Sequence, residues 1–439
     1  MNQESQHEND LVQKHKKNIA VIGAGIVGVN CALALQSLGF NVTLIDKDEV
    51  AAGCSQGNAG HFATEQVFPL AEKSLLWQLP KLLLDPLGPM ALSPRYFPKA
   101  LPWFLRFIAN MPTKIRNKNG DAIKSLNRSA IEYYLPLLEE AQADHLLIRQ
   151  GSLLVYEKTS LAEIKKQWQH YADAGIPVKL LDSKELFVLE PNLSKNISHA
   201  LFFTDVAHTS NPADVCHALA QLSFDKGAVF KKFTLNEITV NNDEIVISDG
   251  SQSLAFDQVV VATGAWSKKL LAQLDYKLPL EVERGYSLDL PKSSEGGIQN
   301  EQASLNRPVA SAERRFIMTP MKHGLRLSGT VEFAGLQQKP NFKRADMLYQ
   351  HAKSIVTDIA NFDEKTAEEK QRWLGFRPSL PDSLPVICKA PKHDNIFFAL
   401  GHQHLGLTQG AITGKLISQI VEGVKTDIDI SPFCISRFN

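Results

Sequence analysis

A glycine-rich turn between an apolar run and a helical segment constrains the fold of this chain more than any other feature. The run NIAVIG at residues 18–23 is short and rich in branched side chains, which is typical of a buried strand. After the turn, residues 29–39 read VNCALALQSLG and favour a helix that stops at its final glycine. A second apolar run follows at residues 41–45. The order strand, helix, strand predicts a βαβ unit with two parallel strands.

The three glycines of the turn have the spacing that lets a dinucleotide lie against the backbone. Gly23 permits the tight turn, Gly25 lets a pyrophosphate approach the main chain, and Gly28 lets helix and strand pack closely. The helix N-terminus offers free N–H groups and a positive dipole end to the phosphates. Asp46 ends the second strand and can accept hydrogen bonds from adenosine ribose hydroxyls. The motif predicts a dinucleotide site without separating NAD from FAD.

Residues 46–60, DKDEVAAGCSQGNAG, continue from the second strand with a run of small and polar residues. This segment resembles the superfamily of FAD-dependent D-amino acid oxidases and dehydrogenases, in which a Ser-x-Gly-Asn-Ala-Gly loop runs past the pyrophosphate toward the flavin ring. The resemblance assigns Ser55, Asn58 and Ala59 to that loop. Gly, Asn and Ser are also common turn residues, so an ordinary surface turn is the alternative.

Two distant segments extend the resemblance. Residues 259–267, VVVATGAWS, resemble the strand that closes over the dinucleotide in these enzymes, which assigns Gly264 and Trp266 to cofactor binding. Residues 401–423 resemble the family's last loop and helix. They add Gly401, Leu405, Gly406 and, as a cap of that helix, Thr408. The resemblance implies FAD as the cofactor, because a helix N-terminus aimed at the flavin would stabilise the negative charge that forms on reduction.

The resemblance also implies an α/β fold with an α+β second domain. We expect a Rossmann-type FAD-binding domain interleaved with an antiparallel-sheet substrate domain, and 439 residues are enough for two such cores. The expected FAD-binding domain combines residues 18–69, 201–280 and 371–430. The expected substrate domain combines residues 70–200 and 281–370. Residues 1–17 are polar without an apolar run, which predicts a disordered extension.

Strand-like patterns predict part of the second sheet. Residues 281–290, EVERGYSLDL, fit one strand, and residues 312–332 fit two strands around a turn at His323 and Gly324. The family would place this sheet as a roof over the flavin.

Oxidation of an amino acid by a flavin is a hydride transfer from Cα to N5, so the protein must hold the substrate over the ring and exclude water. A bidentate arginine is the usual holder of a carboxylate. The candidates are Arg284, Arg314, Arg315, Arg326 and Arg377. Arg377 lies in GFRPSLPDSLPVI, which resembles the segment that supplies this arginine in the D-amino acid oxidase branch. A salt bridge or a contact to a flavin carbonyl is its alternative role.

Four further side chains are candidates for the substrate pocket. His61 and Glu65 follow the flavin loop and could bind a polar ring substituent or neutralise an imino group, although His61 could be a structural histidine. Tyr286 could reach the substrate carboxylate or lie in the core. His404 could hydrogen-bond the substrate or cap a turn. The stretches around His61 and Tyr286, with residues 313–320, resemble hydroxyproline-catabolic members that oxidise cis-4-hydroxy-D-proline or D-proline.

The resemblance predicts an FAD-dependent dehydrogenase that oxidises a D-amino or D-imino acid, with cis-4-hydroxy-D-proline or D-proline as the favoured substrate. Its electrons would pass to a quinone or an electron-transfer partner of the respiratory chain. An oxidase that returns electrons to dioxygen and a non-catalytic flavin-binding scaffold are the alternatives. An NAD-only enzyme would leave the GNAG and GHQHLG segments without a purpose.

A stretch rich in leucine, proline and aromatic residues, 65–118, has two interpretations. One is a set of short helices packed on the sheet, since prolines prevent a long helix. The other is an interfacial patch that inserts Trp77, Trp103, Phe104 and Phe107 into a bilayer. The sequence contains no uninterrupted run of 18 apolar residues, so we expect no membrane-spanning helix. We expect a cytoplasmic protein with peripheral contact to the cytoplasmic face of the inner membrane.

Composition disfavours several other functions. The 47 Lys and Arg residues balance the 47 Asp and Glu residues, so the chain has no net positive charge that would favour binding of nucleic acid. The five cysteines are scattered without a C-x-x-C pair, which favours reduced thiols over a disulfide framework. His402 and His404 have no acid or thiol at ligand spacing around them, so we expect no bound metal.

Overall fold

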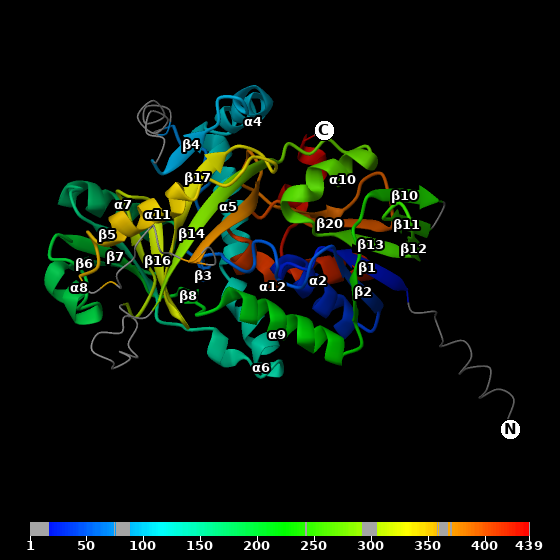
Figure 1. The fold of residues 1–439 in the computed structure, drawn as a ribbon, viewed down its shortest axis with the longest axis horizontal. Coiled ribbons are helices and arrows are strands. Elements are labelled where there is room, and N and C mark those ends of the chain that lie inside the picture. Colours follow the sequence, from blue (N-terminus) through cyan, green and yellow to red (C-terminus); the bar gives the residue numbers. More distant parts are fainter. Residues whose placement is uncertain are drawn as a thin grey trace, which may run out of the picture.

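The computed structural model describes residues 17–73, 75, 88–241, 244–291, 305–357, 359, 368 and 371–438. The expected disordered extension lies outside this part except for Lys17, and so does Trp77. Within the described residues, two large sheets stand side by side with helices packed around them (Figure 1). The predicted fold class is confirmed, because one sheet is mostly parallel and the other is mostly antiparallel.

Sheet A contains the predicted βαβ unit. Its strand order is β19-β20-β13-β1-β2-β9, and every pair is parallel except β19 with β20. The strands are β1 (Asn18–Ile22), β2 (Asn41–Asp46), β9 (Val229–Lys232), β13 (Gln258–Val261), β19 (Val386–Lys389) and β20 (Ile396–Leu400). Helix α2 (Ile26–Ser37) connects β1 to β2, so the order predicted for residues 18–46 is confirmed.

Helices cover one face of sheet A, and a smaller sheet lies on the other. The helical layer shares one apolar core and consists of α2, α5 (Thr113–Asn127), α6 (Ala130–Glu140), η1 (Asp144–Leu146), α9 (Pro212–Asp225) and α12 (Gly406–Glu422). The opposite layer consists of β10 (Glu237–Asn241), β11 (Glu244–Ser248), β12 (Ser253–Phe256) and α10 (Ser267–Gln273). The buried side chains of β1 alternate between these two cores, with Ile19 and Val21 in one and Ala20 and Ile22 in the other.

Sheet C forms the second layer of the molecule. Its order is β18-β14-β17-β16-β15-β5-β7-β6, with β4 paired to β17. The strands are β4 (Met90–Leu92), β5 (Ser152–Tyr156), β6 (Val178–Asp182), β7 (His199–Phe203), β14 (Glu281–Pro291), β15 (Val309–Ser311), β16 (Phe316–Met321), β17 (Gly324–Phe333) and β18 (Arg372–Ser379). Helices α7 (Leu161–Asp173), α8 (Ser183–Leu189) and α11 (Lys343–Ala352) pack against it. The three strands predicted within residues 281–332 are confirmed.

The predicted division into domains stays a prediction, and the packing differs from it in three places. Strand β18 falls within residues 371–430, expected in the FAD-binding domain, yet it belongs to sheet C. Helices α5 and α6 fall within residues 70–200, yet they pack with α2 and α12 in the core of sheet A. Tyr134 of α6 donates a hydrogen bond to the carbonyl oxygen of Leu407 in α12 at 2.6 Å. Strand β7 crosses the expected boundary at residue 201 and belongs to sheet C. A two-stranded ladder of β3 (His61–Phe62) and β8 (Ala207–His208) lies outside both large sheets.

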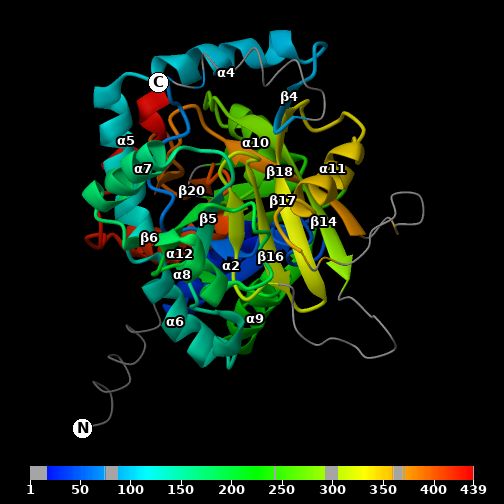
Figure 2. The same ribbon diagram turned by 90° about the vertical axis from the view of Figure 1, so that its left-hand side faces the viewer.

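Helix α4 (Phe97–Ala109) lies at the upper edge of the molecule in both views (Figures 1 and 2). It continues through Pro102, so the expectation that prolines keep these helices short is wrong for this stretch. Pro98 and Pro102 are exposed, so water can solvate the carbonyl that the second proline leaves without its hydrogen bond. Trp103 is buried and packs against Phe107 and Phe333 at ring distances of 5.1 and 5.5 Å. The proposed insertion of Trp103 into a bilayer is therefore wrong.

Candidate cofactor and substrate site

The predicted glycine turn leads from β1 into the N-terminus of α2. Gly23 has a φ of 112°, in the left-handed region, and a Cβ there would lie 2.4 Å from the carbonyl oxygen of Ala262. A Cβ on Gly28 would lie 1.8 Å from the carbonyl oxygen of Gly23. Gly25 differs, because a Cβ there would approach only Ser55 Oγ, at 3.4 Å. Close packing thus requires Gly23 and Gly28, whereas Gly25 leaves open space beside the helix N-terminus.

A cavity of about 1160 Å³ opens at this turn. Its walls come from the turn, the end of β2, η2 (Gly264–Trp266) and the loop before α12. The predicted cofactor residues that line it are Gly23, Gly25, Asp46, Ser55, Gly264, Trp266, Gly401 and Gly406. The carboxyl ends of the five parallel strands β1, β2, β9, β13 and β20 meet here, which is where open α/β sheets bind their ligands.

Asp46 lies at the wall of this cavity. Its Oδ2 accepts a hydrogen bond from Ala24 N at 2.7 Å, and its Oδ1 accepts one from Asp48 N at 3.0 Å. The side chain is half-buried, so its oxygens keep free lone pairs for a ligand hydroxyl. Lys47, which the sequence analysis did not single out, lies over the ring of Trp266 at 5.7 Å, and both line the cavity. The sequence feature that could have revealed Lys47 is its position directly after Asp46, the acid that ends β2.

The predicted flavin loop, residues 55–60, is held to α2 and by its own hydrogen bonds. Ser55 Oγ accepts a hydrogen bond from Ile26 N at 2.9 Å. Asn58 Oδ1 accepts one at 2.8 Å from the N–H two residues later in the chain. Ala59 lies between these two groups and is half-buried. The loop thus has a defined shape next to the helix N-terminus.

Sheet C holds the other side of this loop. Arg326 Nη1 donates to the carbonyl oxygen of Asn58 at 3.0 Å, while its Nε and Nη2 bind Asp289 at 2.7 Å each. Ser287 Oγ donates to the carbonyl oxygen of Gly57 at 3.2 Å. The guanidinium of Arg326 is therefore engaged in fixing the loop and is a poor candidate for the substrate carboxylate.

Helix α12 begins at Gly406, with Leu405 at the N-cap position and no side-chain cap. The prediction that Thr408 caps this helix is therefore wrong. Thr408 is fully buried in the first turn, where its Oγ1 accepts a hydrogen bond from Ala63 N at 2.9 Å. This contact ties α12 to the segment after the flavin loop. Gly401, with a φ of 79°, makes the turn that brings the helix N-terminus to the cavity.

Arg377 lies on the face of sheet C that meets the flavin loop. Strand β18 pairs with β14, and a Cβ on Gly285 would lie 2.3 Å from Arg377 Nη2, so the absent side chain makes room for the guanidinium. Burial lowers the pKa of Arg377, and the nearby Glu283 carboxylate opposes this shift. In the described part of the chain its one hydrogen bond runs from Nη1 to the carbonyl oxygen of Thr330, at 3.0 Å. Several N–H groups therefore remain for a ligand.

His404 and His61 lie close enough to Arg377 to share its electrostatic field. Burial and, to a smaller extent, the neighbouring Arg377 and His61 lower the pKa of His404 to about 4. The His404 side chain is nevertheless exposed to solvent. We call the group formed by Arg377, His404 and His61 the candidate substrate recess. His61 Nε2 lies 3.7 Å from Glu65 Oε1. Three of the four predicted catalytic residues are thus brought together.

Tyr286 lies on the opposite face of β14. It is buried in the core under α11, where its hydroxyl donates to Glu332 Oε2 at 2.7 Å and accepts from Asn341 N at 3.0 Å. Ser287, the next residue, faces the flavin loop instead. This placement supports the alternative weighed for Tyr286, that of a core residue, and we leave it out of the proposed substrate site.

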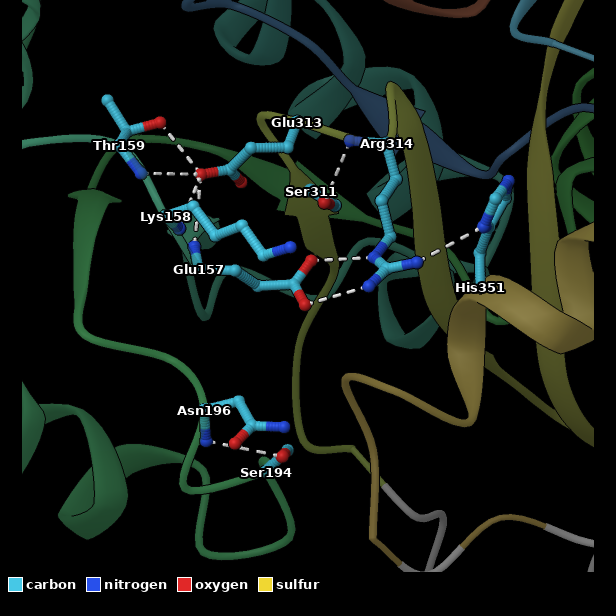
Figure 3. Close-up of polar contacts among 9 residues, drawn as sticks. All are labelled: Glu157, Lys158, Thr159, Ser194, Asn196, Ser311, Glu313, Arg314 and His351. Carbon is cyan, nitrogen blue, oxygen red and sulfur yellow. Dashed lines mark hydrogen bonds and ion pairs between the residues drawn. The ribbon is translucent and has the colours of Figure 1, made fainter.

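Two other arginine candidates are paired away from the flavin loop. Figure 3 shows Arg314 facing Glu157, to which its Nε and Nη2 donate at 2.6 and 2.8 Å. Its Nη1 lies 3.3 Å from His351 Nδ1, so this guanidinium joins strand β5 to helix α11. Arg284 is fully buried, with its Nε 3.1 Å from Glu332. Neither guanidinium faces the recess that contains Arg377.

Comparisons with known proteins agree with this geometry. The sequence profile of FAD-dependent oxidoreductases matches residues 18–420. A D-amino-acid oxidase of Bradyrhizobium diazoefficiens is 32% identical over 96% of this chain and 99% of its own length. The chain belongs to the FAD-dependent oxidoreductase family.

One further sequence relative and one solved structure are also similar to this FAD-dependent oxidoreductase. A D-amino acid dehydrogenase of Vibrio vulnificus is 27% identical over 93% of this chain and 96% of its own length. Glycine oxidase from Geobacillus kaustophilus has a similar fold, with a TM-score of 0.68, 22% identity, and coverage of 96% of this chain and 99% of that one.

The family match confirms the predicted cofactor, FAD, and the residues around the cavity fit it. The open space at Gly25 and the N-terminus of α2 can receive a pyrophosphate. Asp46 offers carboxylate oxygens to a ribose, and Trp266, 43% exposed, offers an aromatic surface at the same wall. The roles of the individual residues stay predictions.

Two absences hold for the residues that the structure describes. No helix there combines the length and the apolar character that crossing a membrane requires. No group of three or more His, Cys, Asp or Glu side chains there could hold a metal ion.

Proposed function

We propose that this FAD-dependent oxidoreductase is a dehydrogenase that oxidises a D-amino or D-imino acid to the imino acid. The observation that carries the proposal is the position of Arg377 on the face of sheet C that meets the flavin loop, with His404 within reach of its charge. The names of the two relatives, D-amino-acid oxidase and D-amino acid dehydrogenase, point to the same substrate class. Bound FAD would supply the acceptor for the hydride that leaves the substrate Cα.

The side chains of the recess supply binding and orientation. Arg377 offers a planar fork of N–H groups to the substrate carboxylate. His404, whose pKa is about 4, is neutral at pH 7 and can exchange a hydrogen bond with the substrate nitrogen without repelling it. Sheet C, as the roof, would exclude water from the reacting carbon.

His61 and Glu65 support cis-4-hydroxy-D-proline or D-proline as the favoured substrate. Glu65 is 3% exposed, and its Oε2 has no hydrogen-bond partner in the described part of the chain. His61 Nε2 is likewise buried without one. A buried carboxylate oxygen without a hydrogen bond is costly, and a substrate hydroxyl or imino N–H would relieve that cost by donating to Glu65 Oε2. Apolar linear substrates offer no such side-chain donor.

An anaerobic substrate panel tests this proposal. D-proline and cis-4-hydroxy-D-proline should bleach the flavin faster than linear D-amino acids, and their L-isomers should leave it oxidised. In Glu65→Gln, the preference for the hydroxylated ring over D-proline should fall, because an amide is a weaker acceptor than a carboxylate. Equal bleaching by L-proline would contradict the stereochemistry. No bleaching by any amine would favour a non-catalytic scaffold.

The electron acceptor has two candidates. We propose a membrane quinone or an electron-transfer partner, whereas the name of the Bradyrhizobium relative favours dioxygen. Peroxide yield in air separates them. A dehydrogenase should turn over quickly with an artificial dye and release little peroxide, and fast stoichiometric peroxide release would make the chain an oxidase.

The outer surface of α4 supports a membrane acceptor. Its exposed apolar side chains follow a helical spacing and are Phe97, Leu101, Leu105 and Ile108, with exposed fractions of 42, 39, 60 and 43%. Residues 88–120 contain six Lys or Arg residues and no Asp or Glu. Such a combination favours an anionic bilayer surface, at about 1 kcal/mol for each cation. Tyr96 and Lys99, at the start of α4, also line the cofactor cavity.

Vesicle sedimentation tests this membrane contact. Vesicles with anionic lipid should bind the protein, more weakly at high salt, and Leu101→Ser with Leu105→Ser should reduce binding while dye-linked activity persists. Val188→Ser is the matched control, because Val188 is 83% exposed on α8 and belongs to another surface. Equal loss of binding in the control, or no binding by the unaltered protein, would reject the contact.

A further inference from the structure

Two cysteines outside the cofactor cavity contact each other. Cys388 lies on β19 and is 3% exposed, whereas Cys434 follows η4 (Ser431–Phe433) and is partly exposed. The two thiols lie close enough to shift each other's pKa. Ile435 N donates to Cys388 Sγ at 3.4 Å, which holds residue 434 against the strand. The two residues are thus adjacent in space although 45 residues separate them in the sequence.

The environments of the two thiols differ. The neighbouring Cys388 thiol and, to a smaller extent, Ser436, whose Oγ donates to Cys434 Sγ at 3.2 Å, lower the pKa of Cys434 to about 5. The neighbouring Cys434 thiol and burial raise the pKa of Cys388. A partly exposed thiolate beside a buried thiol is the arrangement of an attacking and a resolving cysteine.

We propose that Cys388 and Cys434 are a redox modification site that forms a reversible disulfide with hydrogen peroxide as the oxidant. The Cys434 thiolate attacks one peroxide oxygen, the O–O bond breaks, and the departing hydroxide takes a proton to become water. Cys388 then loses its proton and attacks the sulfenic sulfur, which forms the S–S bond and releases the second water. Two thiols are oxidised and one peroxide is reduced to two waters.

The contacts of the segment after Cys434 indicate which parts of the structure the disulfide would hold together. Arg437 Nε donates to Asp382 Oδ2 at 2.7 Å, and its Nη2 donates to the carbonyl oxygen of Leu384 at 2.8 Å. The carbonyl oxygen of Leu380, at the start of that loop, accepts a hydrogen bond from Gln403, which lines the cofactor cavity. The disulfide would hold η4, η5 (Ile435–Phe438) and residues 380–384 together beside the cofactor loop.

Peroxide titration of the reduced, FAD-loaded full chain tests the proposal. After quenching with an alkylating reagent, peptide mass spectrometry should find Cys388 linked to Cys434, and dithiothreitol should reverse the link. The thermal midpoint of unfolding should rise on oxidation of the unaltered chain and stay unchanged in Cys434→Ser. Cys31 and Cys216, both fully buried, serve as internal controls and should stay alkylatable after denaturation.

Two variants separate the roles of the thiols. Cys434→Ser should abolish the link and leave Cys388 reduced, because the buried thiol has no nucleophilic partner. Cys388→Ser should let a sulfenic acid accumulate at Cys434, which a dimedone adduct would detect. The proposal is overturned if the cysteines oxidise independently, if Cys54 links to either of them, or if peroxide leaves both reduced while it oxidises Cys54. Cys434→Ser is a mild change at a partly exposed site, so the test does not depend on the buried variant folding.

Discussion

Gly28→Leu should yield a protein that does not retain FAD. Even a Cβ at this position would lie 1.8 Å from the carbonyl oxygen of Gly23, so the leucine must push α2 away from β1. Overpacking of this kind costs about 1–3 kcal/mol and moves the N–H groups that would receive the pyrophosphate. The ratio of visible flavin absorbance to protein absorbance after desalting measures the loss. Full flavin content in this variant would contradict the assignment of the glycine turn.

Gly25→Val separates loss of cofactor from loss of fold. A side chain there meets Ser55 Oγ and then the open cavity, and the backbone φ of −78° suits any residue. The variant should therefore unfold near the temperature of the FAD-free unaltered chain while it binds FAD far more weakly. If both glycine variants lose FAD but only Gly28→Leu loses its secondary structure, the turn serves both packing and binding.

Arg377→Ala should raise the substrate KM and leave FAD bound. Loss of a charged hydrogen-bonding partner from a buried site costs about 2–5 kcal/mol, which corresponds to a KM rise of roughly 30-fold or more. Steady-state kinetics with D-proline and a dye acceptor measures the change, and flavin absorbance reports the cofactor. An unchanged KM would move the carboxylate site to another residue, and loss of FAD would favour the alternative role at a flavin carbonyl.

Arg326→Ala is the matched control, because both arginines lie on sheet C near the flavin loop. Arg326 binds the loop carbonyls and Asp289, so its removal should loosen FAD and change the KM less. A higher KM with FAD retained in Arg377→Ala, and loosened FAD with a smaller change of KM in Arg326→Ala, would separate substrate binding from loop positioning. The same outcome in both would mean that the loop and the substrate site respond as a unit.

The parts of the fold that follow from local patterns were predictable. Residues 18–46 carry a strand, a glycine turn and a helix stop in direct succession, and each has a local physical cause. The strand pair around His323 and Gly324 follows from an apolar run on each side of a turn. The dinucleotide site also follows from sequence, because the glycines and the strand-ending Asp46 form one continuous segment that carries its own geometry.

The substrate recess depends on contacts that no local pattern contains. His61, Arg377 and His404 come from β3, β18 and the loop before α12, and their approach requires sheet C to close over sheet A. Tyr286 shows the limit most clearly. Successive residues of a strand face opposite sides, so the pairing register decides whether Ser287 or Tyr286 faces the flavin loop.

The sequence by itself determined the βαβ unit and the dinucleotide turn, because these depend on backbone conformation within one short segment. The choice of FAD came from the resemblance of residues 46–60, 259–267 and 401–423 to a known family. Tertiary structure alone decided which face of α4 is outside. Both faces are apolar, with Trp103 and Phe107 on one and Leu101 and Leu105 on the other, so helical periodicity could not choose between them. Packing against Phe333 of β17 made the choice, since it buries the aromatic face and leaves the leucines exposed.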